Sequence, residues 1–133
     1  MIIDTSAIVA ILRGEDDGDR YIEAFARAVA PRISAGTYIE TAIVVDSNRD
    51  PVLSGRLNDL LGITHTNIEP VTKLHADIAR RAYRDFGKGS GHRAGLNFGD
   101  CFAYALAIAT GEPLLFKGSD FSWTDIKPAL KIE

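Results

Sequence analysis

Short runs of strand-forming residues alternate along the chain with longer segments whose apolar residues recur at helical spacing. The short runs predict strands at 1–3, 32–34, 63–71 and 113–116. The longer segments predict helices at about 5–13, 19–30, 37–44, 51–61, 73–86 and 100–110. Strands that are separated by helices pair in parallel, so the pattern predicts an α/β three-layer sandwich with a central, mostly parallel sheet.

Residues that break or cap regular structure mark several of these boundaries. Pro31 ends the second helix, Asp50 precedes Pro51 as an N-cap precedes a first turn, and Thr72 caps the helix that follows the third strand. Four glycines between Gly87 and Gly95 predict a loop. Neither a repeat nor a long linker divides the chain, so we expect a single domain over residues 1–133.

The composition is that of an ordinary globular protein. The 133 residues are 46% hydrophobic and 25% charged, which suffices for a core without disulfides, and the one cysteine fits a reducing compartment. No signal-peptide pattern or membrane-length apolar run occurs, so we expect a soluble, cytoplasmic protein. The net charge of −3 argues against a uniformly basic nucleic-acid surface, although it leaves room for a local basic patch.

Four acidic residues occupy positions at which a site is expected. Asp4 ends the first strand and Asp120 follows the last one, and ligand sites of parallel α/β sheets gather at the carboxyl ends of strands. Asp100 opens the apolar helix that leads into the last strand, and Glu40 interrupts an otherwise apolar helical run. We therefore expect these four side chains to converge.

Such an all-oxygen cluster suits Mg²⁺ or Mn²⁺ better than Zn²⁺. Several carboxylates in one place repel one another, and a divalent cation relieves the repulsion. Phosphodiester hydrolysis is the chemistry that most needs this arrangement, because the cation activates water and neutralises charge in the transition state. The three histidines share no metal-ligand spacing, so activation of water falls to the metal, with Glu40 or Asp120 as the assisting base.

Each acid also has a purely structural explanation. Asp4 and Asp100 fit helix N-caps, and Asp120 fits a turn. Glu40 is the hardest to explain in this way, because an unpaired charge on a core face is costly, and its structural alternative is an ion pair with an arginine.

The order and spacing of these residues resemble the VapC group of PIN-domain toxins from bacterial toxin–antitoxin pairs. The matching segments are MIIDTSA at 1–7, TYIETA at 37–42, LNFGDCF at 96–102 and LLFKGSDF at 114–121. None of them is decisive alone, whereas together they span nearly the whole chain.

The resemblance implies a PIN-domain ribonuclease that needs Mg²⁺ or Mn²⁺ and leaves 5′-phosphate ends. By position, Asp4 and Asp100 match the principal metal ligands, and Glu40 and Asp120 match the remaining acids of the family. Thr5 or Ser6 matches a polar residue that holds a water or the scissile phosphate. The resemblance also implies a homodimer and a cognate antitoxin that blocks the acidic site.

Basic residues in the glycine-rich loop have two interpretations of equal weight. Lys88, His92 and Arg93 form an RNA-contacting patch with the arginines of the preceding helix, or they are part of a solvated surface. Elsewhere we expect the acidic run at 15–19 to be solvated, Lys117 to be a surface lysine, and Cys101 and Trp123 to be packing residues.

Two other functions compete with a metal-dependent ribonuclease. A phosphoacceptor receiver domain also carries an aspartate after its first strand and a lysine after a late one, but it needs an aspartate at the end of the third strand, where this chain has Glu69-Pro70-Val71. A non-catalytic module that binds RNA or a partner through the acidic pocket is the main alternative. Dehydrogenase and P-loop functions are excluded, because no glycine-rich fingerprint follows the first strand.

Overall fold

Four short parallel strands form the central sheet. This computed structural model describes residues 1–131, and its strands are β1 (Ile2–Ile3), β2 (Arg32–Ser34), β3 (Asn67–Glu69) and β4 (Leu114–Leu115). Their order in the sheet is β3-β2-β1-β4, with β1 paired to both β2 and β4. The first strand therefore lies beside the last one, and the predicted parallel α/β sheet is confirmed.

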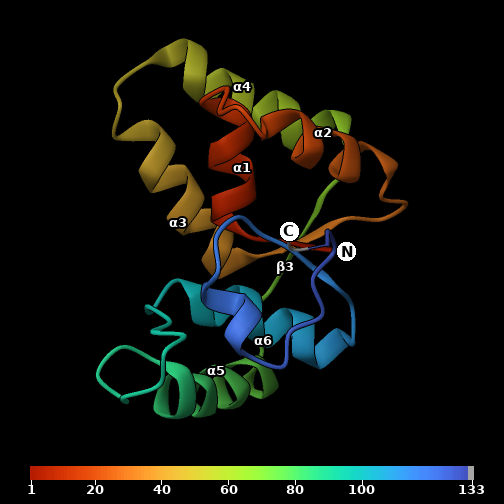
Figure 1. The fold of residues 1–133 in the computed structure, drawn as a ribbon. Coiled ribbons are helices and arrows are strands. Elements are labelled where there is room, and N and C mark those ends of the chain that lie inside the picture. Colours follow the sequence, from red (N-terminus) through yellow and green to blue (C-terminus); the bar gives the residue numbers. More distant parts are fainter. Residues whose placement is uncertain (132–133) are drawn as a thin grey trace.

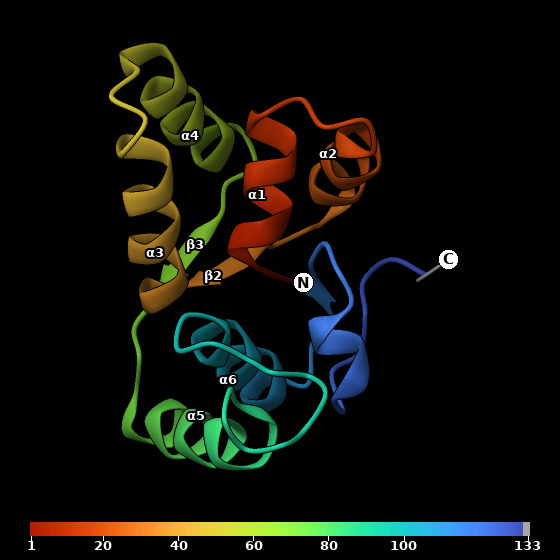
Figure 2. The same ribbon diagram turned by 60° about the vertical axis from the view of Figure 1, so that its left-hand side comes forward.

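Helices cover both faces of this sheet (Figure 1). The helical elements are α1 (Thr5–Leu12), α2 (Gly18–Arg27), α3 (Ala35–Asp46), α4 (Pro51–Ile63), α5 (Lys73–Phe86), α6 (Asp100–Thr110) and the 3₁₀ helix η1 (Asp120–Trp123). Helices α1 to α4 lie above the sheet in Figure 1, and α5 and α6 lie below it; the turned view in Figure 2 shows the same separation. The three-layer sandwich is confirmed.

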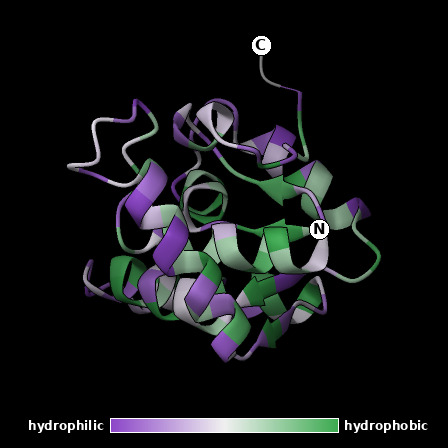
Figure 3. Cartoon of the chain, turned by 90° about the horizontal axis from the view of Figure 1, so that it is seen from below, coloured by the Kyte–Doolittle hydropathy of each residue, from purple (hydrophilic) through white to green (hydrophobic). Residues whose placement is uncertain are grey.

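Strands β1 and β4 are buried on both faces, and their successive side chains point to opposite helical layers. Ile2 and Leu114 belong to the core cluster between the sheet and helices α5 and α6. Ile3 and Leu115 belong to the cluster between the sheet and helices α1 to α4. All four are fully buried. Figure 3 shows hydrophobic strand segments in the interior. Strands β2 and β3 differ, since only Ile33 and Ile68 are apolar in them. The carboxyl ends of β1 and β4 are held side by side at the edge where Asp4 follows β1.

The third strand is shorter than the segment 63–71 that the apolar pattern predicts. Ile63 still belongs to α4, and the chain then turns through His65, which has a left-handed φ of 53°. Only Asn67–Glu69 pairs with β2, which itself has three residues, and Pro70 has no N–H with which to extend the ladder. The prediction was too long because β-branched residues favour strands without marking where a partner strand ends.

Helix α2 ends at Arg27, earlier than the end at Ala30 that Pro31 predicts, because Ala28 is already extended with ψ 131°. The starts of α4 and α5 follow the local signals. Asp50 and Thr72 cap α4 and α5 through their side chains, as predicted. The loop between α5 and α6 is closed by a bridge between Gly87 and Leu96. None of the helices in residues 1–131 has the length and apolarity that are needed to span a membrane.

Candidate active site

Asp4 is a buried carboxylate at the junction of β1 and α1. It is the N-cap of α1, since its Oδ2 accepts hydrogen bonds from the Ser6 N–H at 3.0 Å and from the Ser6 hydroxyl at 2.6 Å. The residue is only 3% exposed, and its other oxygen, Oδ1, has no hydrogen-bond partner in the structure. Asp4 therefore does serve as a cap, yet capping satisfies only half of its carboxylate.

Burial and neighbouring negative charges raise the pKa of Asp4. Burial, with smaller contributions from the Asp100 and Glu40 carboxylates, raises the pKa of Asp4 to about 7, and the two hydrogen bonds from Ser6 oppose the rise. A buried carboxylate with one unpartnered oxygen and two acidic neighbours is costly in its charged form. Such a group is stabilised by a cation.

Glu40 projects from α3 towards the start of α1. Its Oε1 accepts a hydrogen bond of 2.6 Å from the Thr5 hydroxyl, which lies 2.8 Å from the hydroxyl of buried Thr41. The arginine ion pair that would explain Glu40 structurally does not occur within residues 1–131. A threonine hydroxyl holds this carboxylate in place instead, and its charge is not neutralised.

Asp100 is the first residue of α6, and it is locked to the turn that precedes the helix. Its Oδ2 accepts from the Asn97 N–H at 2.9 Å, and the Asn97 carboxamide oxygen accepts from the Asp100 N–H at 2.8 Å. Partial burial raises the pKa of Asp100, with contributions from the Glu40 and Asp120 carboxylates, whereas the hydrogen bond from Asn97 and the charge of Lys88 lower it. The carboxylate is thus rigidly placed beside two other acids.

Asp120 opens η1 five residues beyond β4 and is exposed to solvent. Asp100 and Glu40 raise the pKa of Asp4, and Glu40 and Asp120 raise the pKa of Asp100, so Asp100 is the acid through which the other three are electrostatic neighbours. Within residues 1–131, no group of three or more His, Cys, Asp or Glu side chains lies close enough together to hold a metal ion. The region is therefore an open acidic cluster, in which water would complete the coordination of any cation.

Lys117 connects the carboxyl edge of the sheet with the loop before α2 through ion pairs and a hydrogen bond. Its ammonium group pairs with Glu15 and, at 2.8 Å, with Asp17, and its backbone N–H donates to the Ser6 hydroxyl at 2.9 Å. Lys117 is a partly exposed surface lysine, as predicted, whereas the acidic run is not merely solvated, because Glu15 and Asp17 pair with this lysine. The pairing joins residues about a hundred positions apart, which no local pattern reveals.

The basic loop lies beside the acidic cluster and is ordered by its own contacts. Lys88 and Arg93 are exposed. The half-buried His92 is held internally, because its Nδ1 accepts from the Ala94 N–H at 3.0 Å and its ring packs edge-on against Phe86 at 4.9 Å. Arg93 stacks on the ring of Trp123, with its guanidinium carbon 3.5 Å from the ring centroid.

Sequence reasoning missed two residues that position the acids. Asn97 fixes Asp100 by the reciprocal hydrogen bonds described above. Gly99 leaves room for Glu40, since a Cβ at this position would lie 1.6 Å from Glu40 Oε2. The Asn-x-Gly-Asp spacing at 97–100 was visible in the sequence, but only the approach of α3 to this turn explains it.

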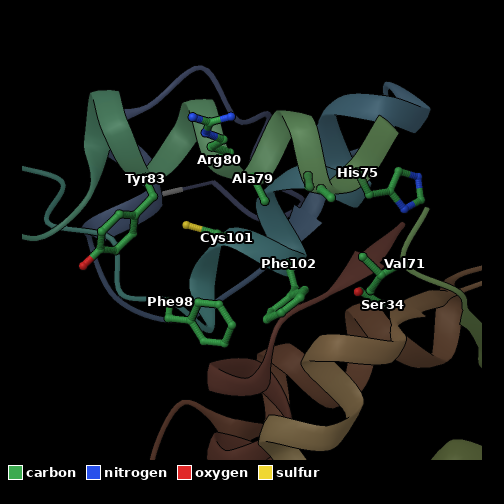
Figure 4. Close-up of a pocket in the computed structure, with 11 residues that line it drawn as sticks. Ser34, Val71, His75, Ala79, Arg80, Tyr83, Phe98, Cys101 and Phe102 are labelled. Atoms are coloured by element: carbon green, nitrogen blue, oxygen red, sulfur yellow. The ribbon is translucent and has the colours of Figure 1, made fainter. Parts of the chain in front are cut away.

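Two apolar pockets share Phe98 and Phe102 in their walls, and one of them reaches the acidic cluster at Glu40. One, of about 360 Å³, lies between α5 and α6 (Figure 4), where Cys101 and Tyr83 contribute to its wall. The other, of about 400 Å³, is lined by Phe98 and Phe102 together with Glu40 and Gly99. Phe98 is 75% exposed. An apolar surface thus leads directly up to the acids. Cys101 itself is buried, as predicted.

Comparison with known proteins identifies the fold and the family. Residues 1–127 match the PIN domain family. Ribonuclease VapC28 from Mycobacterium tuberculosis is 57% identical over 130 residues, which cover 98% of either chain. The chain belongs to the VapC ribonucleases of the PIN domain family. Ribonuclease VapC42 from the same species is 47% identical over 129 residues, covering 97% of this PIN domain and 98% of that protein.

Solved structures share the architecture of this PIN domain at low sequence identity. A toxin–antitoxin complex from Klebsiella pneumoniae matches with a TM-score of 0.71 and 16% identity over 98% of both chains. VapC20 from Mycobacterium tuberculosis, described as a sarcin–ricin loop cleaving toxin, matches with a TM-score of 0.71 and 17% identity over 94% of this chain and 95% of that one. Both likenesses confirm the predicted PIN fold.

Proposed function

We propose that this PIN domain is the toxin of a toxin–antitoxin pair and hydrolyses RNA phosphodiester bonds with a divalent cation, Mg²⁺ or Mn²⁺, at the acidic cluster. The observation that carries the proposal is the Asp4 carboxylate, which is buried and has Oδ1 unpartnered among further acids. The relatives named ribonuclease support RNA as the substrate.

The residues present fit a Mg²⁺-type ion. Asp4 and Asp100 would hold it, with Glu40 and Asp120 acting directly or through water. Mg²⁺ is usually bound by one or two carboxylates and keeps several waters, so its binding does not require a group of three protein ligands, and no such group occurs within residues 1–131. When bound, such a cation lowers the pKa of water and neutralises charge on the phosphate in the transition state.

The chain's own residues have distinct tasks in this proposal. Thr5 holds Glu40, and Ser6 holds Asp4, so these hydroxyls position the acids. Either Glu40 or the exposed Asp120 accepts the proton of the attacking water. Lys88 and Arg93 hold phosphates of the strand beside the site, and an RNA contact by His92 stays a prediction.

Asp100→Asn should abolish cleavage of total cellular RNA, because it removes a charge while keeping the side-chain oxygen that accepts from the Asn97 N–H. We expect a loss of at least about a thousandfold, comparable to the loss of an essential catalytic group. The assay compares Mg²⁺, Mn²⁺ and EDTA, and the ends are mapped for 5′-phosphates. Asp16→Asn, the same change at an exposed acid outside the cluster, is the matched control.

The outcomes separate nuclease from binding module. Cleavage that survives both EDTA and Asp100→Asn would rule the proposed site out. RNA binding without cleavage in Mg²⁺ and Mn²⁺ would instead favour the non-catalytic module.

We further propose a cognate antitoxin and a homodimer. The pocket shared by Phe98, Phe102 and Glu40 offers an apolar surface that continues into the acids, and this suits a partner segment that combines apolar and basic residues. The structural likeness to a chain of a toxin–antitoxin complex is consistent with such a partner. Co-expression with a candidate antitoxin, followed by co-purification, tests the partner, and sizing of the free chain tests the homodimer.

A further inference from the structure

The single tryptophan of this chain is held half-exposed beside the acidic cluster. Trp123 is 42% exposed although Arg93 stacks on its ring at 3.5 Å. Trp123 packs against Arg93, but its exposure means that it is not the packing residue of the interior that the sequence predicts. None of the salt bridges within residues 1–131 involves Arg93, so its charge is not neutralised by a nearby carboxylate. An aromatic ring and an unneutralised guanidinium together form one exposed surface.

The 3₁₀ geometry of η1 places this surface next to the acids. Asp120 and Trp123 are the first and last residues of η1. In a 3₁₀ helix, side chains three positions apart lie on the same face, separated by about 6 Å along the axis. The indole therefore lies one turn from an acid of the proposed site, which is within the reach of a neighbouring nucleotide.

The loop that carries Arg93 is fixed rather than free. Its ends are joined by hydrogen bonds of 2.9 Å from the Lys88 N–H to the Leu96 carbonyl and from the Leu96 N–H to the Phe86 carbonyl. In Figure 2 this loop extends towards the C-terminal segment that carries η1. A fixed loop holds the guanidinium against the indole before any ligand arrives, which reduces the entropy lost on binding.

We propose that Trp123 and Arg93 form a base-stacking subsite that holds an unpaired nucleobase of single-stranded RNA beside the scissile phosphate. Every base has a π-face, so aromatic rings and arginine planes bind single strands with little sequence preference. Arg93 adds hydrogen-bond donors for the adjoining phosphate. The subsite rests on the proposed ribonuclease function for its purpose, but stacking itself requires neither metal nor cleavage.

Intrinsic fluorescence tests the subsite directly, because Trp123 is the only tryptophan. The wild-type chain is titrated in EDTA with a single-stranded RNA of about ten nucleotides, a length typical of single-strand sites. We expect the emission to be quenched along a saturable curve. Unchanged emission at saturating RNA, or an absence of binding, would overturn the proposal.

Variants separate stacking from a structural role. Trp123→Ala should weaken binding of the labelled oligonucleotide roughly tenfold, Trp123→Phe less, and Arg93→Ala by a similar factor. Tyr83→Ala is the matched control, since Tyr83 is an aromatic of nearly equal exposure, 43%, on α5. Equal binding by Trp123→Phe, Arg93→Ala and wild type would contradict the subsite, even if Trp123→Ala unfolds. Quenching by a wild-type chain that cleaves no RNA would support the subsite while refuting the nuclease.

Discussion

Asp4→Asn should stabilise the cation-free protein at neutral pH and, at the same time, abolish cleavage. Burial and the nearby acids raise the pKa of Asp4 from 3.8 to about 7 in the folded chain. At about 1.4 kcal/mol per pKa unit, the charged carboxylate costs the fold up to about 4 kcal/mol. Asparagine carries no charge and remains a good N-cap, so we expect a gain of about 1–3 kcal/mol in the free energy of unfolding.

The pH dependence has a defined sign. Between pH 3.8 and about 7 the folded state binds more protons at Asp4 than the unfolded state does. The free energy of unfolding therefore falls as pH rises through this window and levels off above it. Urea unfolding in EDTA at pH 5 and pH 7.5 should show this fall for wild type and for Asp16→Asn, and a much smaller one for Asp4→Asn. An equal slope in all three proteins would mean that Asp4 titrates normally.

Added Mg²⁺ should reverse the order of stability. A cation that binds only the folded state stabilises it in proportion to the logarithm of its concentration once the site is filled. Wild type should gain stability with Mg²⁺ at pH 7.5 and gain less at pH 5, because the cation then competes with the proton on Asp4. Asp4→Asn should gain little at either pH, and its cleavage of RNA should fall at least about a thousandfold.

Gly99→Ala should reduce cleavage about a hundredfold with little change in the fold. The backbone of Gly99 has ordinary helical angles, φ −63° and ψ −38°, so alanine is conformationally acceptable there. The obstacle is steric: the new Cβ would lie 1.6 Å from Glu40 Oε2 and 2.4 Å from Glu40 Cδ. Glu40 must move away and lose its hydrogen bond with Thr5, and a displacement of about 1 Å in an active site can cost two orders of magnitude.

Two comparisons show whether the loss of RNA cleavage in Gly99→Ala is caused by displacement of Glu40. Gly55→Ala in α4, where a Cβ meets nothing within 4 Å, should leave cleavage unchanged and add about 0.5–1 kcal/mol of stability. In a Glu40→Ala background the clash disappears, so Gly99→Ala should cause little further loss. Additive losses in the double variant would show that Gly99 acts by another route.

The sequence alone determined the features that rest on local chemistry. Apolar runs at Met1-Ile2-Ile3 and Leu114-Leu115 marked the strands that now lie side by side, and Thr72 and Asp50 marked two helix starts. The four acids were recognised because each follows a strand, opens a helix or interrupts an apolar face. These signals can be recognised in the sequence alone, because periodicity, capping and strand ends depend on residues only a few positions apart.

The tertiary structure decided the features that depend on distant partners. The extent of β3 follows from the length of β2, and the environment of Glu40 follows from Thr5 and Gly99, on two other segments. Lys117 pairs with acids about a hundred residues away, and Arg93 stacks on a tryptophan thirty positions later. Packing brings these groups together only after the sheet has closed, and no residue-by-residue preference encodes which side chain a distant one will meet.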